Sequence, residues 1–227
     1  MINRTKFALL AAAALSLPLA APAAAQDRAG SIQIKGFVTG VLPDGEIDEV
    51  ITDGIGLPAN GDTRATDTVV PTVAVEYFVS DNFSIETICC ITPHDVRGTG
   101  DLAGAELIDN AIILPATVTA KLHFDLGSGF KPYVGAGPAY FFIFSEDVGA
   151  DAADLGASDV DLSDELGLAL QAGVDIALSD SGLGLSFDAK RYFIGTTATF
   201  RAGDTVALQT DHDLDPWVIS GGLTYRF

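Results

Sequence analysis

The chain ends on the stretch LDPWVISGGLTYRF, from Leu214 to Phe227, which has the pattern of a transmembrane β-strand. Aromatic and aliphatic residues recur at every second position from Trp217 onward, interrupted by one glycine, and this two-residue period is typical of a strand. A strand ending on a bare aromatic would be an aggregation hazard at the edge of a soluble sheet. The pattern therefore predicts the closing strand of a membrane barrel, with Tyr225 facing lipid and Arg226 facing the lumen.

The opposite end of the chain has the pattern of a secretory signal peptide. In residues 1–25, Arg4 and Lys6 precede a short apolar run and an alanine-rich cleavage site. A membrane-spanning helix is the alternative, but the run is short, rich in alanine and broken by two prolines. We therefore predict a removable signal segment over residues 1–25 and an exported barrel domain over residues 26–227.

The exported part is apolar without resembling a helical membrane protein. Hydrophobic residues make up 48% of the chain, yet no stretch after Gln26 approaches the roughly 20 continuous apolar residues that a spanning helix needs. Alternating strands, with one face toward lipid and the other toward a lumen, account for both facts. A periplasmic β-sandwich would alternate as well, but its inner face must be dry, and the inward positions of this chain carry charges.

Eight strands are predicted where alternating runs are separated by clusters of Gly, Pro, Asn and Asp. They span Ser31–Val41, Thr68–Val79, Phe83–Thr92, Ile112–Leu126, Lys131–Phe144, Glu165–Leu178, Gly184–Phe200 and Leu214–Phe227. Short turns alternate with long polar connections, as the periplasmic turns and external loops of outer-membrane barrels do. We therefore predict an all-β fold, an eight-stranded antiparallel transmembrane β-barrel with both termini on the periplasmic side.

Five blocks of sequence carry a family resemblance. They are VEYFVSDNFSIE at 75–86, KPYVGAGPAYFFIF at 131–144, DLGASDVDLSDELGLALQAGVD at 154–175, DAKRYFIGTTATF at 188–200 and LDPWVISGGLTYRF at 214–227. Together they resemble the OmpW family of eight-stranded outer-membrane proteins, and the resemblance covers nearly all of the exported part. It implies a place in the outer membrane and the passage of small hydrophobic molecules through an external apolar pocket.

Charged side chains recur at inward positions near the periplasmic ends of the strands. An eight-stranded barrel is just wide enough for side chains to fill, so these groups should pair into a plug instead of lining a water channel. With Lys35 included, four cations face four carboxylates and leave the lumen nearly neutral. We expect Lys121, Asp175 and Lys190 to tolerate polar replacement. The predicted plug consists of Glu76, Glu86, Lys121, His123, Asp175, Asp188, Lys190 and Arg226.

The outer halves of the strands carry apolar residues at inward positions. Phe141 and Ile143 face inward by parity, and Ile112, Leu114 and Val218 are candidates to join them. We interpret this cluster as an apolar pocket open to the outside. Ordinary barrel filling together with an aromatic girdle is the alternative for any one of these residues.

Two prolines weaken the wall of the predicted barrel. Pro115 and Pro138 lie in the fourth and fifth strands, and each removes one donor from the hydrogen-bond ladder. The wall between them is the predicted site of a lateral opening into the bilayer. The alternative is that each proline sits at a strand end or a bulge.

The chain is strongly acidic. Its formal net charge is -19, and residues 26–227 carry -21, because the first 25 residues hold two cations and no carboxylate. Nucleic acid is therefore excluded as a partner. Residues 145–165 contain eight Asp or Glu and no Lys or Arg, and we interpret them as a solvated external surface. Divalent-cation binding near lipopolysaccharide is the alternative, although the spacing matches no EF-hand loop.

The residues of an enzyme acting on lipid are missing. The chain has three histidines, no His-x-Ser pair and no Gly-x-Ser-x-Gly turn. His123 is the only plausible base, and the charges predicted around it assign it to the plug. We therefore expect no catalysis, no cofactor and no metal centre.

Three functions remain open. The first is the passage of small hydrophobic molecules through the external pocket, with lateral exit to the bilayer. The second is a structural or adhesive barrel whose acidic loops contact ions, lipopolysaccharide or other cells. The third is a general aqueous porin, which the small number of strands argues against. In each case outer-membrane lipids surround the barrel, and the terminal Phe227 resembles the signal read by the outer-membrane insertion machinery.

Overall fold

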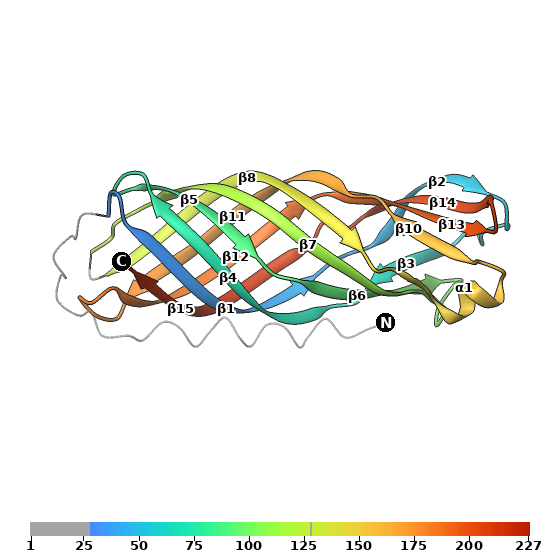
Figure 1. Ribbon diagram of the computed structural model, residues 1–227, viewed down its shortest axis with the longest axis horizontal. Helices are drawn as coiled ribbons and strands as arrows, with labels where there is room; N and C mark the ends of the chain where they lie inside the picture. Colours follow the sequence, from blue (N-terminus) through green and yellow to red (C-terminus); the bar gives the residue numbers. More distant parts are fainter. Residues whose placement is uncertain (1–27, 128) are drawn as a thin grey trace.

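The computed structural model describes residues 28–127 and 129–227 (Figure 1). The predicted signal segment over residues 1–25 lies outside the described residues. Within them the chain is mostly β-structure with one short helix, α1 (Ala150–Asp154). No helix in these two ranges is long and apolar enough to cross a membrane.

Eight strands close into a barrel. In order around the ring they are β1 (Ile32–Leu42), β4 (Thr68–Phe78), β5 (Phe83–Cys89), β7 (Glu106–His123), β8 (Phe130–Phe144), β11 (Glu165–Ala177), β12 (Leu183–Phe193) and β15 (Trp217–Arg226). Neighbouring strands are antiparallel throughout, and β15 returns to β1 along a ladder from Gln33–Arg226 to Leu42–Trp217. The ring therefore has no free edge, which confirms the predicted eight-stranded barrel.

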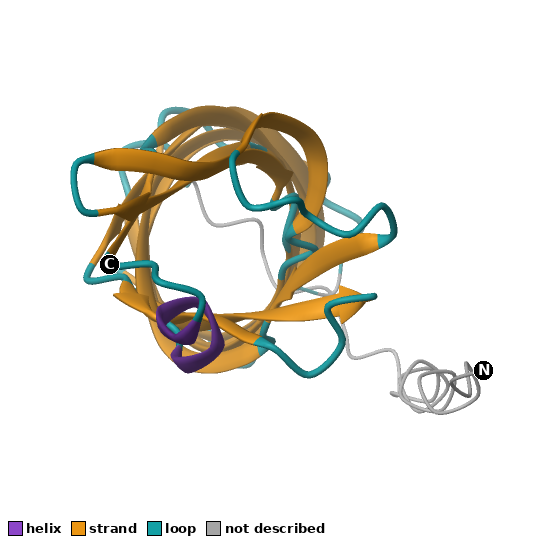
Figure 2. Cartoon of the chain, turned by 90° about the vertical axis from the view of Figure 1, so that its right-hand side faces the viewer, coloured by secondary structure: helices purple, strands orange, loops and turns teal. Residues whose placement is uncertain are grey.

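The end of the barrel opposite the carboxyl terminus, here called the outer end, is also built of strands (Figure 1). We predicted long polar loops there, and this was wrong because residues such as Ile108, Val160 and Leu162 give the segments a buried face. Strands β10, β13, β14 and β2 form a second sheet, while β3 and β6 extend the barrel sheet. Figure 2 looks down the barrel from this end and shows α1 at its rim. The strands are β2 (Glu46–Asp53), β3 (Gly61–Ala65), β6 (Thr92–Gly100), β9 (Asp147–Val148), β10 (Asp159–Leu162), β13 (Gly195–Ala202) and β14 (Thr205–Asp213).

The barrel strands alternate between an inner and an outer face, as predicted. The lumen side chains Lys35, Glu76 and Lys121 are fully buried, whereas Val75 and Leu122 are exposed on the outside. Because the ring of ladders satisfies most backbone groups internally, this apolar outer face is suited to contact with hydrocarbon.

Phe227 follows the end of β15. Its backbone N–H donates a hydrogen bond of 2.9 Å to the carbonyl of Ile32, and its ring is exposed and lies edge-on to Tyr225, 4.8 Å between centroids. The aromatic end is thus displayed on the outside of the barrel. Its recognition by the insertion machinery stays a prediction.

Arginine on the outer face should destabilise the barrel by an amount that depends on depth. Val75→Arg places a charge on the exposed face of β4 and should lower the free energy of unfolding by about 2–4 kcal/mol. Val79→Arg changes the same residue type in the exposed turn after β4, and it should cost about 0–1 kcal/mol because the charge reaches water. Reversible urea unfolding with lipid vesicles measures both values. Equal costs would contradict the face assignment.

Candidate functional site

Four charged side chains fill the lumen near the carboxyl-terminal end of the barrel. Lys35 Nζ lies 2.8 Å from Glu76 and 3.1 Å from Glu86. Lys121 Nζ lies 3.0 and 2.8 Å from the same two carboxylates and 3.7 Å from the ring centroid of Tyr133. The four charged side chains are 0–1% exposed. Each lysine is therefore shared by at least two carboxylates in an interior where every pair is stronger than in water.

A second layer extends this network toward β11 and β12. Lys190 Nζ lies 2.6 Å from Asp188 and 3.2 Å from Glu86. The Gln171 amide donates hydrogen bonds of 2.8 Å to Glu86 and 2.6 Å to Asp188, and the Tyr133 hydroxyl donates one of 2.7 Å to Asp188. Tyr133 and Gln171 thus satisfy Asp188 Oδ2, which Lys190 leaves free, and Gln171 adds a second donor to the Glu86 oxygen that Lys190 contacts. Buried ion pairs require such additional hydrogen bonds.

The network reaches the periplasmic end through His123 and Arg28. His123 Nε2 lies 2.8 Å from both Glu76 and the Ser84 hydroxyl, and its Nδ1 lies 3.4 Å from the Arg28 guanidinium. Arg28 precedes β1 and lies over the Phe78 ring, 4.8 Å from its centroid. Ser84 and Glu76 contact the same imidazole nitrogen, so they are not placed as the nucleophile and orienting acid of a hydrolase.

The structure brings the predicted plug residues Glu76, Glu86, Lys121, His123, Asp188 and Lys190 into one connected network, which Asp175 joins through Lys35 at 3.4 Å. Arg226 is only half-buried and lies at the end of β15. The prediction missed Arg28, Gln171 and Tyr133. Gln171 and Tyr133 have the inward parity of their strands, which is the signal that could have found them, whereas Arg28 precedes the first strand and has no such pattern.

A small inner pocket of about 20 Å³ lies among the residues of the outer half of the barrel. Phe141 and Val218 line it, as predicted, together with Tyr192, whose ring lies 5.3 Å from that of Phe141. Ile143 is buried in the same apolar cluster without lining the pocket.

Ile112 and Leu114 do not line the inner pocket. Both are half-exposed on the outer face, and the intervening Ile113 lines the pocket instead. Thr117 and Lys121 face the lumen, so between Ala111 and His123 the pleat of β7 turns odd-numbered side chains inward and even-numbered ones outward. The prediction for these two residues was wrong because it followed apolar character instead of parity.

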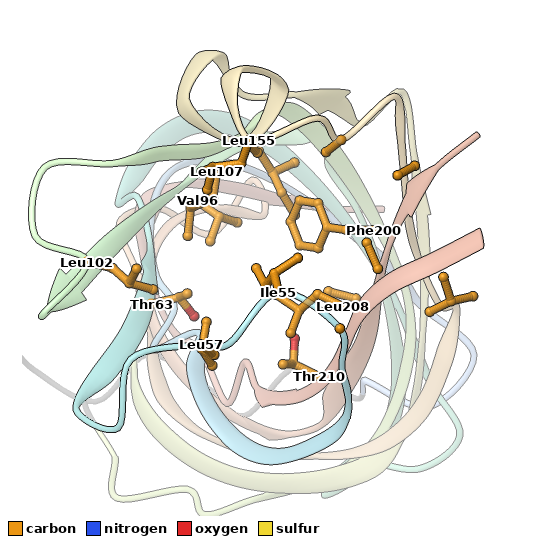
Figure 3. Close-up of a pocket in the computed structure, with 18 of the residues that line it drawn as sticks. Ile55, Leu57, Thr63, Val96, Leu102, Leu107, Leu155, Phe200, Leu208 and Thr210 are labelled. Carbon is orange, nitrogen blue, oxygen red and sulfur yellow. The ribbon is translucent and has the colours of Figure 1, made fainter. Parts of the chain in front are cut away.

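A larger cavity, here called the outer chamber, lies at the outer end. Its volume is about 340 Å³, and residues of β2, β3, β6, β13, β14 and α1 line it. Figure 3 shows side chains from opposite walls, including Leu107, Phe200, Ile55 and Leu57, directed into the cavity. The predicted pocket residues do not line this chamber, because most of its wall comes from segments that we predicted as loops.

The buried polar groups in the chamber wall satisfy one another. His212 Nδ1 lies 3.1 Å from the Thr63 hydroxyl, and its Nε2 lies 2.6 Å from the Thr210 hydroxyl. The Thr63 hydroxyl also donates to the carbonyl of Gly45 at 2.5 Å. Burial lowers the pKa of His212, which favours its neutral imidazole. The wall therefore presents a neutral and largely apolar surface to the chamber.

Comparison with known proteins places this barrel in a family. Residues 28–227 match the model of the OmpW family. The chain belongs to the OmpW family. Outer membrane protein W of Vibrio cholerae is 33% identical over 87% of this chain and 89% of its own length. Uncharacterized outer-membrane protein y4mB of Sinorhizobium fredii is 33% identical over 96% of this chain and 90% of its own.

A solved structure agrees with this assignment. The crystal structure of the outer membrane protein OprG from Pseudomonas aeruginosa matches with a TM-score of 0.79 at 26% identity, covering 89% of this chain and 98% of that one. This OmpW-family protein is therefore an outer-membrane β-barrel. Because such barrels have short periplasmic turns and longer external connections, the outer chamber lies on the extracellular side.

The wall of this OmpW-family barrel is interrupted beside Pro115. The β5–β7 ladder ends at Ile88–Thr117, and the β6–β7 ladder begins at Thr92–Ile113. Between these pairs, residues 89–91 and 114–116 face each other without ladder pairing in the part of the chain that the structure describes. The β4–β5 ladder also ends at residue 89. We call residues 89–91 and 114–116 the wall break.

The direction of the backbone groups explains the wall break. The His123 N–H donates 2.8 Å to the carbonyl of Asn82, and the Ile113 carbonyl accepts 3.2 Å from the Thr92 hydroxyl. Odd-numbered backbone groups of β7 therefore point toward the third barrel strand, which is formed by β5 and β6. Pro115 is odd-numbered and lacks the N–H that pairing there would need.

The interruption predicted between the fourth and fifth strands is smaller. Pro115 is in register with Phe141 on that side, and only the positions of Val118 and Thr119 are missing from the β7–β8 ladder, opposite Gly137 and Pro138. Pro138 is exposed on the outer face and does not line the inner pocket, whereas Pro115 does. The longer break thus lies between the third and fourth strands, because the two prolines point toward different neighbours.

Proposed function

We propose that this OmpW-family barrel passes small hydrophobic molecules from the outside into the outer membrane. The single observation that supports this most is the outer chamber, an apolar cavity of about 340 Å³ at the extracellular end. Its size falls at the lower end of the range for small-molecule sites, which are about 300–1,000 Å³ and mostly apolar. In this proposal the protein acts without catalysis.

The proposed route leaves the barrel sideways. Straight passage would take an apolar molecule through the ionic plug, where every displaced charge would lose a partner in the buried interior. The inner pocket offers a shorter exit, because Cys90 and Thr92 line it from one side of the wall break and Ile113 and Pro115 from the other. We therefore propose lateral exit to the bilayer at the wall break.

Filling the outer chamber should slow uptake. Ala157 is half-buried in the chamber wall, and Ala157→Trp should reduce uptake of an uncharged apolar solute by about tenfold, the effect of losing roughly 1.4 kcal/mol of binding free energy. Ala103→Trp is the matched control, because Ala103 is exposed at the same end outside the chamber lining. Uptake is compared in cells with equal amounts of folded barrel. Normal uptake by Ala157→Trp would contradict a route through the chamber.

The other two functions give different results in the same cells. A structural or adhesive barrel that contacts lipopolysaccharide through its acidic loops predicts that apolar uptake does not depend on the protein. Within residues 28–127 and 129–227, no group of three or more His, Cys, Asp or Glu is arranged to hold a metal ion. An aqueous porin predicts steady ion conductance by the purified protein, which a paired plug should block.

A further inference from the structure

The outer chamber contains no partner for a charged ligand. Among the residues described, its lining includes no Asp, Glu, Lys or Arg. Its buried polar side chains, Thr63, Thr210 and His212, are hydrogen-bonded to one another. A carboxylate or an ammonium group entering this cavity would give up its water without gaining an ion pair, which is costly for either charge.

The lumen cations below the chamber are already occupied. Lys35, Lys121 and Lys190 each lie within 3.4 Å of at least two carboxylates. Drawing one of them to a ligand carboxylate would leave a buried Glu or Asp without its partner. Among the described residues, the linings of the outer chamber and the inner pocket include no Lys or Arg, so a ligand carboxylate finds no lysine or arginine partner in either lining.

The charge of the molecule is concentrated around the chamber. Residues 43–67, 93–111, 145–165 and 195–215 together hold 23 Asp or Glu against three Arg, a formal charge of -20. The rest of residues 26–227 has eight carboxylates against seven cations. The pKa of Asp213 is raised, first by partial desolvation and then by neighbouring carboxylates such as Asp48. Such a field repels anions at the mouth over roughly a Debye length, about 8 Å in physiological salt.

Resting on the proposed function, we propose that the outer chamber selects uncharged apolar molecules and excludes ionised carboxylates of the same carbon skeleton. Two separate features act in the same direction. The acidic surface lowers the concentration of anions at the mouth. The uncharged lining forms no ion pair that would offset the desolvation of the anions that reach it. Ammonium compounds are attracted to the acidic mouth, but inside the chamber they lack an ion-pair partner just as carboxylates do. The favoured ligands are therefore neutral molecules.

The test uses a medium-chain fatty acid and its methyl ester at pH 7, with cells that make the full-length protein and cells that lack it. The protein should raise the initial rate of ester uptake at least about tenfold more than that of acid uptake. Equal increases for both probes would overturn the selectivity while leaving the proposed function standing. No increase for either probe would remove the proposed function itself and this inference with it.

A lysine introduced into the chamber distinguishes the effect of the uncharged lining from the effect of the acidic external surface. Thr205 lines the chamber and is exposed to solvent, so Thr205→Lys gives a carboxylate a partner inside without burying a charge. Thr52→Lys makes the same change at an exposed position of β2 outside the lining. Uptake of the fatty acid should rise several-fold with Thr205→Lys and remain low with Thr52→Lys. An equal rise in both variants, or no rise in either, would overturn the role assigned to the lining.

Discussion

Oxidising a cysteine pair across the wall break should abolish protein-dependent uptake of an uncharged apolar solute. The variant carries Pro115→Cys and Cys89→Ser, which leaves the native Cys90 facing residue 115 in the register set by the flanking pairs. Neighbouring antiparallel strands place facing Cα atoms about 4.5–5.5 Å apart, within the range that a disulfide spans. The bridge would tie the third strand to the fourth where we propose that the solute leaves, and a reducing agent should restore uptake.

The same substitution at two prolines provides the matched comparison. Pro115→Val returns an N–H that points toward the third strand, so it should narrow the wall break and slow uptake. Pro138→Val restores an N–H in β8 that points toward β7 from the side away from the inner pocket. This substitution should therefore leave uptake unchanged. Heat-modifiable migration confirms equal amounts of folded barrel. Slower uptake with Pro138→Val alone would place the exit between the fourth and fifth strands, and normal uptake by the oxidised disulfide would favour a straight-through route.

The barrel could be predicted because one simple period governs it. Each barrel strand turns alternate side chains to lipid and to lumen, so the charges at Glu76, Glu86 and Lys121 mark the inner face without knowledge of the neighbouring strands. The errors at Ile112 and Leu114 came from setting this parity aside in favour of hydrophobicity. Applied strictly, the same period leads from Lys121 to Ile113 and Pro115, which both line the inner pocket.

The outer chamber could not be predicted in the same way. Its wall joins Thr63, Val96 and His212, which lie far apart in sequence, and their proximity depends on pairings such as β14 with β2. Short strands rich in Asp and Gly resemble loops when read singly, and their apolar residues become a lining only after the segments pair. Which ladder Pro115 weakens also depends on the strand register. A proline removes a donor only from the ladder toward which its nitrogen points.

The burial of the plug reverses an expectation drawn from the sequence. Lumen position alone suggested that Lys121 tolerates polar replacement, but its side chain is fully buried between Glu76 and Glu86. Lys121→Met should therefore lower the free energy of unfolding by about 3–5 kcal/mol, because two carboxylates lose a shared partner inside the barrel. Urea unfolding in lipid vesicles measures this change.

A second cation shows that burial, not charge itself, produces this effect. Arg97 also contacts several carboxylates, including Glu106 and Asp95, but 36% of its side chain is exposed, so Arg97→Met should change stability far less than Lys121→Met. Adding Glu86→Gln to Lys121→Met removes one of the stranded charges and should recover part of the lost stability, a coupling that two independent sites would not show. If Lys121→Met costs no more than Arg97→Met, water reaches the plug, and the energetic barrier that directs apolar molecules sideways would disappear with it.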